Sequence, residues 1–82
     1  MIKEKILDLL KKIIKEDVEI KVEVPREKNF GDYSTNVAFL LSKKLKKNPN
    51  QIAQDLVKKI EAKKPDFIEK VEIEKGFINF YL

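Results

Sequence analysis

Apolar residues near the start of the chain recur at the spacing of an amphipathic helix over residues 2–16. The stripe consists of Ile2, Ile6, Leu9, Leu10, Ile13 and Ile14. Lysines and acidic residues fill the opposite side. A basic amphipathic helix can lie on a membrane, but the strand-rich remainder of this chain needs a cover. We therefore favour a helix packed on a sheet.

Residues 18–24 alternate strictly between apolar and charged side chains, which is typical of a half-buried strand. The apolar positions, expected to face the core, are Val18, Ile20, Val22 and Val24. Pro25 ends this strand because proline cannot donate to the ladder. A polar loop with a turn signal at residues 31–32 follows, and residues 33–35 could form a short strand or an extended lead-in.

Two further helices are predicted. The cap of the first is Ser34, Thr35 or Asn36, each of which can accept from a free amide of the first turn. Its buried side consists of Val37, Leu40, Leu41 and Leu45. The second of these helices begins after Asn48, which is predicted to be its N-cap. Pro49 takes the first helical position, and Gln51 stands at capping-box spacing. The helix runs to about residue 62.

The end of the chain reads as a hairpin. Residues 67–74 alternate again, residues 75–76 make a tight reversal, and the final strand spans 77–82. Side chains of a strand alternate between faces, so Ile78, Phe80 and Leu82 share one apolar face that belongs on a core. The pattern predicts an α+β fold of two layers, an antiparallel sheet with helices packed on one face.

The opposite face of the final strand carries Phe77, Asn79 and Tyr81. Aromatic rings that can stack on bases, beside an amide that can hydrogen-bond base edges, are used in recognising single-stranded RNA. Aromatic residues on an outer sheet face also serve plain cross-strand packing. From the strand alone, both interpretations stay open.

Composition narrows the function. The 82 residues make one small domain, and 18 cations against 14 acids give a net charge of +4. Seventeen of the cations are lysines, and Arg26 is the only arginine. This mild excess favours a polyanionic partner, and the basic run at residues 43–47 suits either phosphate contact or a solvated helix end.

Several chemistries lack their usual residues. The chain has no cysteine and no histidine, which removes thiolate metal sites and the commonest general base. With two glycines, a phosphate-cradling loop is not expected. Asp32 and Ser34 are better explained by a turn and a helix cap than by catalysis. We predict no catalytic residue, no metal site and no cofactor in this domain.

Three segments together resemble a known family. They are GDYSTNVAF at residues 31–39, LKKNP with the following Ile-Ala at 45–53, and GFINF at 76–80. In order and spacing they resemble the N-terminal additional domain of arginyl-tRNA synthetase. The resemblance covers nearly the whole chain, taken as a single domain 1–82, and implies an α-β-β-α-β-β core in two layers.

The resemblance also implies a role, which is contact with the D-loop at the corner of tRNA(Arg). By the family pattern, Phe77 would stack on a flipped base and Asn79 would hydrogen-bond its edge. Some members have an asparagine three residues before the aromatic, where this chain has Glu74. Geometry adds Tyr81, and charge adds Lys75, Lys46 and Lys47, as further tRNA contacts.

The histidine-containing ATP signature of the synthetase is missing, so the resemblance implies a fragment of a longer, ATP-dependent arginine–tRNA ligase rather than an autonomous enzyme. Its partners would be tRNA(Arg) and the remaining synthetase domains. The longest apolar run, residues 37–41, is too short for a membrane span, and no signal peptide is evident, so a cytoplasmic location is expected. The alternative function is a structural or protein-interaction domain that packs on other synthetase domains without reading a base.

Overall fold

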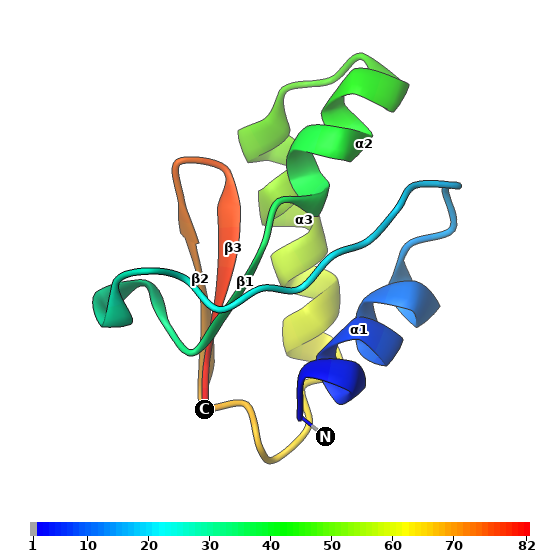
Figure 1. Cartoon of the computed structure of the whole chain (residues 1–82). Coiled ribbons are helices and arrows are strands. Elements are labelled where there is room, and N and C mark those ends of the chain that lie inside the picture. The colour runs from blue at the N-terminus through cyan, green and yellow to red at the C-terminus, as the bar shows by residue number, and fades with distance from the viewer. Residues whose placement is uncertain (1) are drawn as a thin grey trace.

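Helices and a small sheet form two layers in the computed structural model, which describes residues 2–82 apart from the side chain of Lys28. In chain order the elements are α1 (Ile2–Ile13), the short helix η1 (Lys28–Phe30), β1 (Tyr33–Thr35), α2 (Val37–Leu45), α3 (Pro49–Ala62), β2 (Lys70–Glu74) and β3 (Phe77–Tyr81). Figure 1 shows the three long helices on one side of the sheet and η1 on the other. The α+β class and the antiparallel sheet with helices on one face are confirmed.

The central strand of the sheet is β3, which pairs antiparallel with β1 on one side and with β2 on the other. The β2–β3 hairpin turns at Lys75 and Gly76, whose φ angles are 51° and 85°. Positive φ at both central residues defines the type I′ turn that two-residue hairpins prefer. A Cβ on Gly76 would lie 2.6 Å from the ring of Phe39, so glycine is needed here for space as well as conformation.

The strand predicted at residues 18–24 is wrong as a continuous strand. Only Glu23 is paired, through an isolated antiparallel bridge to Ser34 whose two backbone hydrogen bonds measure 2.8 and 2.7 Å. The predicted alternation holds as far as Val22, which is buried, whereas Val24 is 71% exposed. An alternating pattern reports which side chains are buried, but a strand also needs a neighbouring backbone to pair with. The neighbour here is β1, which has only three residues, and Pro25 ends the segment that could pair with it.

The first helix is shorter than predicted. Helix α1 ends at Ile13 rather than at residue 16, with one further amide, that of Ile14, bonded to the carbonyl of Leu10.

Of the three residues predicted to cap α2, Thr35 makes the hydrogen bond. At the start of α2, the hydroxyl of Thr35 accepts from the amide of Val37 at 3.2 Å. Asn36 occupies the N-cap position itself and makes no capping bond with its side chain.

Helix α3 begins as the sequence predicts. The side chain of Asn48 accepts from the amides of Asn50 and Gln51 at 2.8 and 3.3 Å, and Pro49 stands in the first turn. The side chain of Gln51 donates to Asp55 at 3.2 Å instead of reaching back to the N-cap. Only half of the capping box is therefore formed.

The core lies between the sheet and the helices. From β3 it receives Ile78 and Phe80, both fully buried as predicted, while Leu82 lies at the rim and is 37% exposed. The fully buried helical side chains include Ile6 and Leu10 of α1 and Ile60 of α3. Within residues 2–82, no helix is long and apolar enough to cross a membrane.

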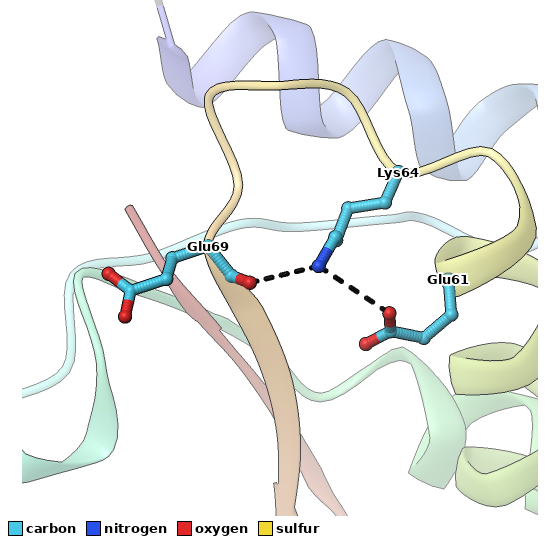
Figure 2. Close-up of polar contacts among 3 residues, drawn as sticks. All are labelled: Glu61, Lys64 and Glu69. Carbon is cyan, nitrogen blue, oxygen red and sulfur yellow. Dashed lines mark hydrogen bonds and ion pairs between the residues drawn. The ribbon is translucent and has the colours of Figure 1, made fainter.

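The connection from α3 to β2 is tied down by one lysine. Lys64 donates to the backbone carbonyl of Glu69 at 2.9 Å and forms an ion pair with Glu61 at 3.7 Å, as Figure 2 shows. The amide of Glu69 in turn donates to the carbonyl of Tyr81 at 2.7 Å, which extends the β2–β3 pairing by one bond. These contacts hold the start of β2 beside the end of β3, whereas the two-residue turn at Lys75 and Gly76 sets the register of the hairpin.

Candidate nucleic-acid interface

The outer face of the sheet is organised by cross-strand pairs, because residues directly opposite one another in an antiparallel sheet point to the same side. Asn79 stands between Ser34 of β1 and Glu72 of β2, and Ser34 is itself bridged to Glu23. Phe77 is opposite Glu74, next to the hairpin turn. The outer face of the sheet therefore presents polar side chains between two aromatic residues of β3, with Phe77 next to the hairpin turn and Tyr81 opposite Lys70 at the other end of the strand.

A pocket of about 440 Å³ opens on this face. Its lining comprises Lys21, Glu23, Val24, Pro25, Arg26, Phe30, Ser34, Thr35, Asn36, Glu74, Lys75, Phe77 and Asn79. Residues 21–26 provide one side, Ser34 and Asn79 come from the paired strands between, and the hairpin provides the other side. The volume lies within the range of about 300–1,000 Å³ typical of small-molecule pockets.

Phe77 is the exposed aromatic of the site, with 45% of its surface accessible. Its ring meets that of Phe39 from α2 edge to face, with the centroids 5.3 Å apart and an interplanar angle of 67°. This contact orients the ring while leaving part of it open to the pocket. An aromatic held in this way is suited to stacking on a flat partner.

Asn79 lies deeper than a residue on an open sheet face, with only 3% of its surface exposed. Among the described residues its side-chain amide has no hydrogen-bond partner, and yet no buried side-chain nitrogen or oxygen is left unsatisfied. Asn79 is one of the residues that line the pocket. A side-chain amide of this kind carries two N–H donors and one carbonyl acceptor.

Tyr81 shares the outer face but does not line the pocket. Its hydroxyl donates to the carbonyl of Asn29 at 2.7 Å, and the Nζ atom of Lys70 lies 4.6 Å from its ring centroid. Burial, and next the neighbouring carboxylate of Glu72, raise the pKa of Tyr81 above its ordinary value. The residue ties η1 to the end of β3.

Of the three lysines that the sequence nominated, Lys75 lines the pocket beside Phe77. Lys46 and Lys47 follow the end of α2, where Lys46 is the left-handed C-cap with φ of 57°. In Figure 1 the α2–α3 connection and the hairpin turn lie at the same end of the molecule. The structure thus unites Phe77, Asn79 and Lys75 in one pocket and places the other two lysines outside its lining.

Sequence reasoning missed the wall formed by residues 21–26. The alternating pattern predicted that Val24 faces the core, and no role was predicted for Arg26, the only arginine. The exposure of Val24 and the fold of the loop over the outer face depend on where the chain turns after the Glu23–Ser34 bridge. The only sequence signal for that turn was Pro25.

The pocket lining carries charges of both signs. Its lining includes three cations, Lys21, Arg26 and Lys75, and two carboxylates, Glu23 and Glu74. Asp32 has a structural task, because its carboxylate accepts from the amide of Leu82 at 2.8 Å. In the part of the chain that the structure describes, no three acidic residues gather in a way that could hold a metal ion.

Comparisons with known proteins place this geometry in a family. The sequence matches the arginyl tRNA synthetase N terminal domain over residues 1–82. It is 46% identical to the arginine–tRNA ligase of Thermotoga maritima and 48% identical to that of Methanosphaera stadtmanae, in each case over 82 residues and 99% of this chain. The alignments cover 15% and 14% of those proteins.

A solved structure agrees with the sequence matches. Thermus thermophilus arginyl-tRNA synthetase superposes with a TM-score of 0.75 at 33% identity, over 99% of this chain and 13% of the synthetase. The chain thus spans about one seventh of the length of these curated relatives. With the family match over its whole length, the chain belongs to the arginyl-tRNA synthetase N-terminal domain family.

Proposed function

We propose that this domain is the tRNA-binding module of an arginine–tRNA ligase and that it contacts the D-loop at the corner of tRNA(Arg). The observation that carries the proposal is the pocket, which joins the half-exposed ring of Phe77 to the buried side chain of Asn79. A base turned out of its stack offers a flat face and a hydrogen-bonding edge, and these two side chains match them.

Each residue has a distinct part in the proposal. Phe77 stacks on the extruded base, and Asn79 exchanges hydrogen bonds with the base edge from deeper in the pocket. Lys75 neutralises nearby phosphate, and Lys46 and Lys47 add a longer-range attraction that contains no sequence information. Tyr81 contributes by holding η1 in place rather than by stacking.

The module supports catalysis that occurs elsewhere. ATP and arginine would bind the catalytic domain of the longer protein, and this domain would hold the tRNA corner. A weak contact suffices there, because tethering raises the effective concentration of the acceptor end at the distant active site. Such a protein would operate in the cytoplasm, where tRNA is charged.

The second candidate function is packing against other synthetase domains. The observation that favours it is the exposure of two apolar side chains that line the pocket on the outer face, Phe77 at 45% and Val24 at 71%. Salt separates the two candidates. Phosphate contact makes affinity fall steeply as salt rises, whereas an apolar interface changes little.

The test is chemical-shift mapping of the labelled chain titrated with tRNA(Arg) at low and moderate salt. We expect shifts centred on Phe77, Asn79 and Lys75 that fade as the salt concentration rises. Phe77→Ala and Asn79→Ala should each abolish this pattern. The matched controls Ile2→Ala on α1 and Gln54→Ala on α3, both at exposed positions on other elements, should not.

Two outcomes would contradict base recognition. Shifts spread over lysines throughout the chain, unchanged in Phe77→Ala and Asn79→Ala, would indicate generic attraction to RNA. Absence of shifts with tRNA, together with shifts on the same face when the remaining synthetase domains are added, would support packing instead.

A further inference from the structure

The side of the pocket opposite the hairpin is formed by residues 21–26, a segment with no assigned role. The bridge between Glu23 and Ser34 holds it beside β1. Neighbouring strands lie about 4.8 Å apart, so Glu23 is two strand spacings, or about 10 Å, from the backbone of β3 at Asn79. Side chains from this segment and from β3 can therefore reach one ligand placed between them.

The part of this wall formed by Val24 and Pro25 is apolar, and Val24 is exposed. Val24 shows 71% of its surface, the most among the exposed large hydrophobic side chains of residues 2–82, which are Ile2, Val24, Leu45, Phe77 and Leu82. Two of these five, Val24 and Phe77, line the same pocket. Pro25 stands beside Val24 in the lining and restricts the backbone there, which presents this valine to the pocket at little entropic cost.

Cationic groups adjoin the apolar part. Arg26, the only arginine of the chain, lines the pocket, as does Lys21. A guanidinium group offers planar, paired donors that match a phosphate in a bidentate manner, which a lysine cannot do. One wall thus places an apolar surface next to two cationic side chains and the carboxylate of Glu23. A nucleotide likewise joins a flat base to a charged phosphate.

We propose that residues 24–26 form a second nucleotide-binding element. The base that stacks on Phe77 also packs against Val24, and Arg26 binds the phosphate of the same nucleotide. This inference rests on the proposed function and extends it, because the base is then held from two sides by segments far apart in the sequence. Selection of a single extruded nucleotide, rather than of a continuous stack, follows from this enclosure.

The experiment measures binding of a fluorescently labelled tRNA(Arg) transcript to the chain over a series of salt concentrations. Val24→Ser should weaken binding by about threefold or more without changing the salt slope, since only apolar contact is lost. Arg26→Gln should weaken binding and lower the slope of log K against log salt by about 0.7–0.9, the value expected for one phosphate contact. The matched controls are Ile2→Ser and Lys59→Gln, which alter exposed positions on α1 and α3.

Phe77→Ala separates failure of this inference from failure of the proposed function. If Phe77→Ala weakens binding while Val24→Ser and Arg26→Gln behave like their controls, the second element is overturned and the proposed function stands. If Phe77→Ala also has no effect, the proposed function fails as well. Because Val24 and Arg26 are exposed, their variants should fold, and equal thermal midpoints verify this.

A double variant tests whether both side chains hold the same base. If they do, the fold-loss in affinity of the Val24→Ser, Phe77→Ala double variant should be smaller than the product of the two single fold-losses. The reason is that one substitution alone already frees the base from its position between the two side chains. Losses that multiply would overturn the shared-base arrangement.

Discussion

The rings of Phe77 and Phe39 pack in a T-shaped arrangement, with 5.3 Å between their centroids and 67° between their planes. One ring belongs to the strand that faces the pocket and the other to helix α2 on the opposite layer. The two meet at the hairpin end of the sheet, next to Gly76, whose missing side chain leaves room for Phe39. The orientation of a surface residue is thus set by a helix from the other layer.

This contact predicts that Phe39→Leu weakens tRNA binding although Phe39 itself does not contact the RNA. Leucine retains apolar bulk but loses the edge-to-face geometry, which is worth about 0.5–1.5 kcal/mol. We expect a smaller loss of affinity than for Phe77→Ala, together with a broader distribution of Phe77 ring positions. Ring-proton relaxation and tRNA titration check this, and unchanged affinity with a demonstrably mobile ring would contradict it.

The hairpin turn predicts opposite effects at adjacent residues. Gly76→Ala should destabilise the fold by about 1–3 kcal/mol, because its φ of 85° and the ring 2.6 Å from the new Cβ both oppose it. Lys75→Asn should stabilise the fold by up to about 1 kcal/mol, since asparagine tolerates positive φ and Asn-Gly is the preferred type I′ pair.

Denaturant unfolding of both turn variants provides the measurement. Lys75→Asn should at the same time weaken tRNA binding, because the variant removes a cation from the pocket lining. A variant that gains stability and loses affinity would show that the lysine is held in a strained conformation for function. Equal stability of Gly76→Ala and the parent chain would refute the turn assignment.

The start of α3 predicts a clear contrast between two asparagines. Asn48→Ala should cost about 1 kcal/mol of unfolding free energy, because two amides lose their acceptor. Asn36→Ala, at the N-cap of α2, should cost much less, since its side chain makes no capping bond. Thermal unfolding of the pair is the measurement, and equal losses would show that the caps were assigned wrongly.

Tyr81 predicts a loss of stability at alkaline pH. Its pKa is raised in the folded chain, so the unfolded chain releases the phenolic proton first. The associated stability is fully present below about pH 10, the ordinary tyrosine pKa, and is lost as pH rises through the folded-state pKa.

Phenolate absorbance of Tyr33→Phe, in which Tyr81 is the one tyrosine left, gives the titration directly. A midpoint above 10.0 is expected while the chain stays folded. Tyr81→Phe should remove this part of the pH dependence and should also lose the bond to the carbonyl of Asn29. A midpoint at or below 10.0 in the folded chain would contradict the prediction.

The sequence predicted much of the fold because its signals are local. Asn48 and Pro49 mark the start of α3 through bonds within one turn of helix, and Gly76 marks the hairpin through its own φ. The inward positions of Ile78 and Phe80 follow from simple alternation. Each of these features depends on neighbours in the chain and was therefore visible without coordinates.

What the sequence did not reveal depends on contacts between distant segments. Residues 18–24 alternate as a strand would, but β1 offers a single pairing position at Ser34. The depth of Asn79 and the exposure of Val24 both depend on how the loop after Pro25 folds over the sheet. The local pattern identified Phe77 and Asn79 but could not place the wall that faces them.

The pocket has a thermodynamic consequence, because its walls come from segments that are far apart in the sequence. Residues 21–26 and 74–79 meet only when the whole chain is folded, so a molecule bound there has no counterpart site on the unfolded chain. A ligand that binds only the folded chain stabilises it. At a free concentration one hundred times its Kd, the ligand adds about 2.7 kcal/mol to the unfolding free energy. Heat resistance of this small domain would thus report directly on occupancy of its pocket.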